Sequence, residues 1–187
     1  MSDRIMTICC AIAKRNYRSY LELGCYKNDT FNIIGCSRKV GVDIEQGGTH
    51  RMTTDEFFGQ NTEKFDIIFI DATHTHDQVM KDFQSSLRVL NPGGLIVMHD
   101  CNPANASLER PEACGTAWRA FVRLRAYPTL DAIVGNYDHG VGLIHVAPNT
   151  DIVNVPMTMD ELTYDDLEKN RDPWLRLREW RKVEAWL

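Results

Sequence analysis

The feature that most constrains the fold is a short, almost uninterrupted apolar run, Phe65-Asp66-Ile67-Ile68-Phe69-Ile70. A strand covered by helices on both faces needs apolar side chains in both directions, so this run predicts a central strand of a parallel sheet. Three further strand-like runs lie at Ser19 to Leu23, Lys39 to Asp43 and Leu95 to His99. They alternate with segments of helical period, which predicts an α/β fold with crossover helices between parallel strands.

The segments around the central run carry helix signals. Thr75-His76-Asp77-Gln78 reads as a capping box, and apolar residues then recur at helical spacing up to Leu90. Asn91-Pro92-Gly93-Gly94 breaks that helix and leads into the next strand. A second helical segment begins at Ala117, after a loop from Cys101 to Cys114 that is long enough to cover a site.

Two further strand candidates, Leu130 to Val134 and Val141 to Val146, are joined by a tight turn. Strands joined in this way run antiparallel, so the last strand must be reversed relative to its neighbour. The pattern as a whole predicts a doubly wound, Rossmann-like and mostly parallel sheet with a reversed terminal strand.

A chain of 187 residues is long enough to bury a sizeable core. We expect one domain over residues 1–187, with its core at about 17–146 and a C-terminal helical appendage at about 157–187. One apolar helical stripe in the appendage must be buried. Its members are Trp174, Leu177, Trp180, Val183 and Leu187. A homodimer interface, a lid and packing on the parent domain are each compatible with the stripe, and we expect the last.

The charge pattern bears on which classes of partner this chain can bind. The formal charge is −5 and no run of five or more basic residues is present, so we expect neither a nucleic acid nor a membrane as partner. The apolar patch near the N-terminus is too short to span a bilayer and lacks a cleavage pattern. The six cysteines have no zinc-site spacing, as expected for free thiols of a cytoplasmic protein.

The predicted parallel strands all finish at or beside a carboxylate. The residues at these ends are Glu22, Asp43, Asp71 and the pair His99-Asp100. In an open parallel sheet, ligands bind outside the carboxyl ends of the strands, near the point where strand order reverses. Asp43 follows Gly24 by about twenty residues, the place of an acid that binds ribose hydroxyls. A helix cap or a solvated turn is the alternative role for Asp43.

The loop after the first strand has one glycine, Gly24, which allows a tight turn and a close approach to a ligand. We expect a helix to open at Lys27 to Thr30. A phosphate-binding fingerprint needs further glycines two and five residues after the first, where this chain has Tyr26 and Asp29. The loop therefore disfavours a dinucleotide and suits a nucleoside without pyrophosphate.

These motifs together resemble the class I S-adenosylmethionine-dependent methyltransferases. The resemblance is closest to a small group that shares Phe65 to Asp71, then His74, then the stretch from Asn91 to Asp100. Met52 to Phe58 and the terminal hairpin also match, so the resemblance covers residues 17–146. It implies seven strands with the last one reversed, and an enzyme that methylates a small-molecule acceptor such as a sugar or a related hydroxyl-bearing metabolite.

The resemblance also implies a cofactor site. Its members by position are Glu22, Gly24, Tyr26, Asp43, Thr54, Asp55 and Asp71. The first two would lie beside the methionine part of S-adenosylmethionine, and Asp43 would hold the ribose. Thr54 and Asp55 would lie near the adenine. Tyr26 replaces the second glycine that the family usually has in this loop, and this departure bears on how the cofactor is seated.

A hydroxyl acceptor must lose a proton, and the acceptor must be held close to the methyl group for in-line displacement. His74 is the first candidate base because an imidazole titrates near neutral pH. The metal-dependent O-methyltransferases of this fold have a catalytic lysine at the matching place. Asp71 would face the methionine end and the acceptor, while His99 would orient the acceptor, stabilise Asp100 or serve the fold. Alternatively, His74 and His76 merely belong to a polar loop.

A metal is the other way to acidify a hydroxyl. Asp71 and Asp100 from neighbouring strand ends suit a hard ion such as Mg²⁺. The third ligand in related enzymes directly follows the second acid, where this chain has Cys101, a soft ligand that suits Mg²⁺ poorly. Asn102 is the substitute, so Asp71, Asp100 and Asn102 form the expected metal set. The loop from Asn102 to Glu112 is the expected source of acceptor contacts.

Two other functions stay open at this point. A nicotinamide-dependent sugar epimerase or dehydrogenase lacks support because its phosphate-binding glycines are missing. A non-catalytic S-adenosylmethionine-binding module with a regulatory role is the second alternative, because the short connection between Asp43 and Phe65 leaves little chain for a lid over a substrate.

Overall fold

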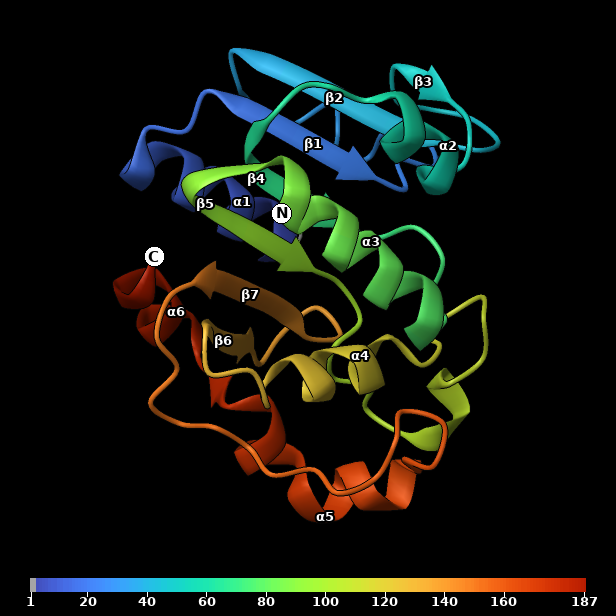
Figure 1. The fold of residues 1–187 in the computed structure, drawn as a ribbon, viewed down its shortest axis with the longest axis vertical. Helices are drawn as coiled ribbons and strands as arrows, with labels where there is room; N and C mark the ends of the chain where they lie inside the picture. The colour runs from blue at the N-terminus through green and yellow to red at the C-terminus, as the bar shows by residue number, and fades with distance from the viewer. Residues whose placement is uncertain (1–2) are drawn as a thin grey trace.

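The computed structural model describes residues 3–187, so residues 1 and 2 of the predicted domain lie outside the described part. A central sheet carries helices on both faces (Figure 1). The strands are β1 (Ser19–Leu23), β2 (Arg38–Asp43), β3 (His50–Arg51), β4 (Phe65–Ile70), β5 (Leu90–Met98), β6 (Leu130–Gly135), β7 (Val141–Val146) and β8 (Leu177–Arg178). The helices are α1 (Asp3–Arg15), α2 (Thr54–Gln60), α3 (His76–Val89), α4 (Ala117–Leu124), α5 (Tyr164–Leu175) and α6 (Trp180–Trp186), with a 3-10 turn at Ala106–Leu108.

The strand order is β3-β2-β1-β4-β5-β7-β6-β8. Parallel pairing joins β3, β2, β1, β4 and β5, and the order reverses between β1 and β4. Strand β7 runs antiparallel to both β5 and β6. The doubly wound sheet with a reversed strand is therefore confirmed, and the switch between β1 and β4 is where such a sheet binds ligands. The expected seven strands are joined by an eighth, the two-residue β8, which pairs with β6.

Strand β4 shows why the apolar run is central. Ile67 and Phe69 face the core layer under α1 and α6, while Ile68 and Ile70 face the opposite layer under α3, α4 and α5. All four side chains are buried. Figure 1 shows these helices on the two faces of the sheet. The strand is held between two apolar layers, so its carboxyl end is a rigid support for the residues directly after it.

Two expected helices differ from the structure. After Gly24 the chain forms turns over residues 26–33 instead of a helix. Tyr26 and Asn28 have left-handed φ angles of 46° and 66°, which interrupt helical geometry. Before α3, Thr75 is the N-cap residue as expected, but its side chain makes no capping hydrogen bond. Gln78 instead donates to Thr54 and to two carboxylates.

The C-terminal stripe was expected on one helix, and this is wrong. Arg176 takes a left-handed conformation with φ 52°, which ends α5 and allows β8 to pair with the sheet before α6 begins. Trp174, Val183 and Leu187 are nonetheless buried within the same chain. The stripe packs on its own domain, as predicted.

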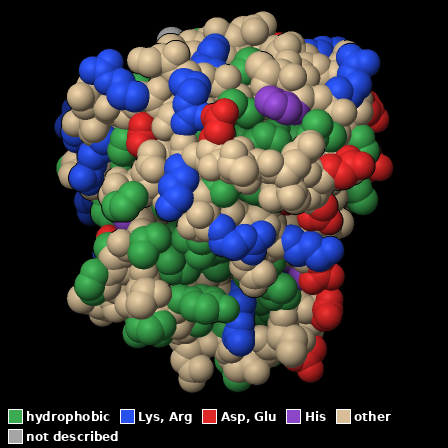
Figure 2. All heavy atoms as spheres, turned by 45° about the horizontal axis from the view of Figure 1, so that its top comes forward, with side chains coloured by type: hydrophobic (Ala, Val, Ile, Leu, Met, Phe, Trp, Pro, Cys, Tyr) green, Lys and Arg blue, Asp and Glu red, His purple; other side chains and the backbone are tan. Residues whose placement is uncertain are grey.

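Two remaining features of the molecule are the length of its helices and the distribution of charge on its surface. None of the helices in residues 3–187 has the length and apolar character needed to cross a bilayer. Figure 2 shows Lys and Arg side chains on one face as separate groups among neutral surface, with Asp and Glu gathered mainly along one side.

Candidate functional site

A cavity of about 620 Å³ opens at the carboxyl ends of β1, β2 and β4, beside the switch point. The structure brings all the predicted cofactor residues to its wall: Glu22, Gly24, Tyr26, Asp43, Thr54, Asp55 and Asp71. His74 lines the same cavity, whereas His99, Asp100 and Asn102 do not. The size is that of a typical small-molecule site.

Gly24 allows the chain after β1 to approach the end of β4 closely at the cavity edge of the sheet. Its φ is +86°, and a Cβ atom there would lie 2.1 Å from the backbone oxygen of Asp71. The Gly24 amide donates to the Val42 carbonyl at 2.8 Å. Only glycine fits this turn, because both the φ angle and the space exclude a side chain.

Asp43 organises the loops on both sides of it. One carboxylate oxygen accepts the Tyr26 amide at 2.7 Å, and the other accepts the amides of Glu45 and Gln46 at 2.8 and 3.0 Å. The turn-forming role and the ribose-binding role are therefore compatible. A carboxylate has about four lone-pair positions, so Oδ2 can still accept a ligand hydroxyl. Tyr26 holds the first loop to Asp43 through its backbone, while its side chain stays exposed at the cavity wall.

Glu22 is the most deeply buried acid at the cavity, with 1% of its surface exposed. Burial raises the pKa of its carboxyl to about 8, although the hydrogen bond from the Tyr20 hydroxyl acts in the opposite direction. A proton or a ligand cation therefore has to balance this carboxylate.

At the other end of the cavity, α2 and α3 place three polar side chains together. The Gln78 amide donates to Thr54 Oγ1 and to Asp55 Oδ1, each at 3.2 Å. A capping box between Thr53 and Glu56 fixes the start of α2. Thr54 and Asp55 are thus held at the cavity wall by a helix N-terminus and by a neighbouring helix.

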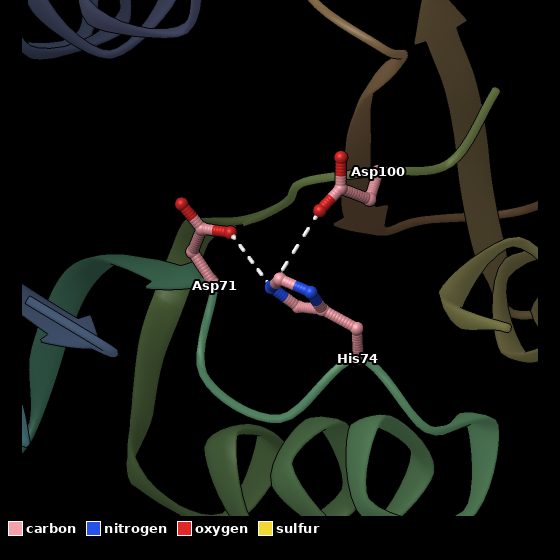
Figure 3. A group of neighbouring side chains, drawn as sticks. All are labelled: Asp71, His74 and Asp100. Carbon is pink, nitrogen blue, oxygen red and sulfur yellow. Dashed lines mark ion pairs between the residues drawn. The ribbon is translucent and has the colours of Figure 1, made fainter. Parts of the chain in front are cut away.

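His74 lies between two carboxylates (Figure 3). Its Nε2 is 3.6 Å from Asp71 Oδ1 and 3.6 Å from Asp100 Oδ2. The adjacent Asp71 carboxylate raises the pKa of His74, and the charge of Asp100 adds to this against the effect of burial. The three residues come from the end of β4, the loop after it and the end of β5. Asp100 has a left-handed φ of 59°, a strained conformation of the kind found at functional sites.

His99 contacts the carboxylates of Asp71 and Asp100 but does not line the cavity. Its Nδ1 is 3.2 Å from Asp71 Oδ1 and 3.4 Å from Asp100 Oδ2, and its Nε2 is 3.4 Å from Asp138 Oδ1. Burial on its own lowers the pKa of His99, but these carboxylates raise it well above the ordinary value. Burial on its own raises the pKa of Asp71, but the His99 charge and the two imidazoles close to the carboxylate bring it down to about 2. The placement suits a residue that orients both carboxylates more than one that touches an acceptor.

The expected Mg²⁺ ligands are not brought together. The Asn102 amide oxygen accepts Arg171 at 2.5 Å, and its amide nitrogen donates to Asn136. Cys101 is buried, with its thiol directed to backbone carbonyls. Asp71, His74 and Asp100 do lie within 4.8 Å of one another. That set includes an imidazole nitrogen, which Mg²⁺ binds poorly, and His99 already lies against both carboxylates. These residues do not fit the expected magnesium site.

One cavity residue, Arg4, carried no clear signal in the sequence. Arg4 of α1 lines the cavity although it lies far from every strand-end motif in the chain. Nothing in an amphipathic helix marks which polar residue will reach a site. Glu112 also lines the cavity. It belongs to the loop that was expected to supply acceptor contacts, whereas Arg110 of the same loop is not part of the wall.

Comparisons with known proteins support the same assignment of the fold. Residues 9–101 match the family model described as a methyltransferase domain. No curated protein matches the chain by sequence.

Three solved structures are similar in fold. Cofactor-bound Rv0187 from MTB is 19% identical with a TM-score of 0.62, over 80% of this chain and 82% of that one. The methyltransferase PaMTH1 of Podospora anserina, bound to SAH, is 19% identical with a TM-score of 0.55, over 78% and 80%. The O-methyltransferase from Bacillus cereus in complex with SAH is 17% identical with a TM-score of 0.53, over 77% and 80%. At these identities the likeness shows a shared fold.

Proposed function

Because residues 9–101 of this chain match a methyltransferase domain, we propose that it binds S-adenosylmethionine in the 620 Å³ cavity and methylates a hydroxyl group of a small molecule. The observation that carries the proposal is the cavity wall itself. Residues from four separate segments of the chain, 22–26, 43, 54–55 and 71–74, line it together, and they include the residues that the family resemblance assigned to cofactor and acceptor.

The wall offers complementary groups for each part of the cofactor. Glu22, Gly24 and Asp43 all line the cavity; in the proposed complex the first two hold the methionine part and Asp43 accepts the ribose hydroxyls. Thr54 and Asp55, fixed by Gln78, form the end assigned to the adenine. When bound, S-adenosylmethionine supplies a methyl group on a positively charged sulfur, which is a good leaving group.

The chain's own residues supply the proton transfer. His74 lines the cavity and is the base that takes the proton of the acceptor hydroxyl. Asp71 and Asp100 hold its imidazole and stabilise the imidazolium that forms. Asp71 stays ionised at neutral pH because its pKa is about 2. His99 holds these two carboxylates in position through its Nδ1 atom, which lies close to both.

The test is a screen of sugars, phenols and related hydroxyl compounds with S-adenosylmethionine, measuring acceptor-dependent release of S-adenosylhomocysteine. His74→Asn should lower kcat by about 100-fold or more, the usual contribution of a general base, and leave S-adenosylhomocysteine binding nearly unchanged. His76→Asn is the matched control, because His76 bonds to Thr116 and Asp160 and does not line the cavity. Full activity in His74→Asn would remove His74 from the mechanism.

A further inference from the structure

Arg4 stands at the start of α1 and reaches the cavity from a different element than the strand-end residues. About a quarter of its side chain is exposed. Among the cavity residues in the described part of the chain, Arg4 is the one Lys or Arg. Seven carboxylates share the wall with it: Glu22, Asp29, Asp43, Glu45, Asp55, Asp71 and Glu112. Arg4 therefore offers an anionic group of a ligand a permanent positive charge at this wall.

The guanidinium of Arg4 is held in a fixed orientation. Its Nη1 donates to both Asp138 oxygens at 3.1 and 3.3 Å, and its Nε donates to Thr30 Oγ1 at 3.3 Å. The backbone amide of Arg4 also donates to Asp138. Within residues 3–187, no hydrogen bond uses Nη2. Two N–H donors of an oriented guanidinium thus stay available at the cavity.

Arg4 belongs to the methionine end of the cavity. Its positive charge is among the influences that lower the pKa of both Glu22 and Asp71, which places it near the two acids that flank Gly24. Thr30, its hydrogen-bond partner, lines the same cavity. The adenine end, by contrast, is built from α2 and Gln78 of α3.

We propose that Arg4 binds the carboxylate of the amino-acid part of S-adenosylmethionine, an inference that rests on the proposed function. The amino-acid part carries an ammonium and a carboxylate side by side. The acids at this end, Glu22 and Asp71, suit the ammonium, and the same acids repel the carboxylate. Arg4 offers the opposing charge, and a charge-assisted hydrogen bond from a held guanidinium is strong and directional.

The test compares two ligands by calorimetric titration of the full chain. S-Adenosylhomocysteine carries the amino-acid part, whereas 5′-methylthioadenosine has the same nucleoside without it. Arg4→Gln should weaken S-adenosylhomocysteine by about 10- to 100-fold, as loss of a charged hydrogen bond does, and change 5′-methylthioadenosine by less than about twofold. Arg4→Lys, which keeps the charge without the planar fork, should fall between Arg4→Gln and the native chain.

Arg51→Gln is the matched control, because Arg51 is exposed on β3 and does not line the cavity. It should leave both ligands unaffected. An equal loss of both ligands in Arg4→Gln would overturn the proposal, since it would mean that Arg4 only supports the fold through Asp138. Failure of the native chain to bind either ligand would instead contradict the proposed function, and this inference would fall with it.

Discussion

Asp71 belongs both to the cavity wall and to the cluster of histidines and carboxylates beside it. The residue lines the cavity, and its carboxylate contacts the imidazoles of both His74 and His99. The contact with His99 has a clear electrostatic consequence. A carboxylate this enclosed would hold its proton, yet the adjacent imidazole keeps it ionised. The negative charge is then available to make His74 a stronger base.

The first prediction concerns the pH profile of Asp71→Asn. His74 must be neutral to accept a proton, so kcat falls as the pH drops through the pKa of His74, which Asp71 raises. An asparagine removes that cause, and the acidic limb of the kcat profile should move to lower pH. The plateau should also fall, because the imidazolium loses a partner. Asp77→Asn, at an exposed carboxylate beside His76, should leave the profile in place. An unmoved acidic limb in Asp71→Asn would contradict this coupling.

The second prediction concerns Glu22 and stability. In the unfolded chain this carboxyl ionises near 4.5, while in the folded protein burial raises the pKa to about 8. Between these values the folded state binds more protons, so its stability falls as pH rises through this window. Glu22→Gln never ionises and escapes this loss. The difference in Tm between Glu22→Gln and the native chain should therefore be larger at about pH 8 than at about pH 5. A difference that does not change with pH would contradict the burial argument.

At the scale of elements, the edge where β1 meets β4 shows how the backbone builds the site. The left-handed Gly24 brings β1 against the Asp71 backbone, and the left-handed Asp100 turns the chain out of β5 toward His74. The turn between β6 and β7 supports this arrangement. Its residues His139 and Gly140 accept the amides of Asn102 and Cys101, and its Asp138 holds Arg4. The group of Asp71, His74 and Asp100 is thus fixed by three neighbouring turns.

The prediction at this scale is that Gly24→Ala abolishes S-adenosylhomocysteine binding and lowers the Tm. The new Cβ would meet the Asp71 carbonyl oxygen at 2.1 Å, so β1 or β4 must shift at the cavity edge. Gly35→Ala is the matched control, because a Cβ there meets nothing within 4 Å. Calorimetric titration and thermal unfolding of both variants give the comparison. Native-like binding by Gly24→Ala would show that the close approach does not shape the site.

At the scale of the whole molecule, much of the sheet could be predicted from the sequence because the strands are short and apolar in both directions. The Phe65–Ile70 strand and the reversed hairpin follow from pattern alone, and the strand-end acids converge because parallel strands share one edge. Features that depend on tertiary contacts could not be read in this way. Strand β8 exists because two residues pair with β6.

The same limit applies to the site. Asn102 was expected to complete a metal-binding set with Asp71 and Asp100, but Arg171, 69 residues further along, donates a hydrogen bond to its amide oxygen. Arg4 reaches the cavity from the N-terminal helix without any local signal. Tyr26 was expected in a loop that leads to a helix, and its left-handed backbone produces turns instead. The cytoplasmic location remains a prediction.

The most direct test of the account is a calorimetric titration of the native chain with S-adenosylhomocysteine, repeated with Asp43→Asn. Asp43 lines the cavity, and its carboxylate can still accept a hydrogen bond from a ligand hydroxyl. Asp165→Asn, an exposed acid on α5, matches the charge change away from the site. One-to-one binding that Asp43→Asn weakens by about tenfold or more, and Asp165→Asn does not, is the predicted result. No binding to the native chain at millimolar ligand would contradict the assignment of this cavity to S-adenosylmethionine.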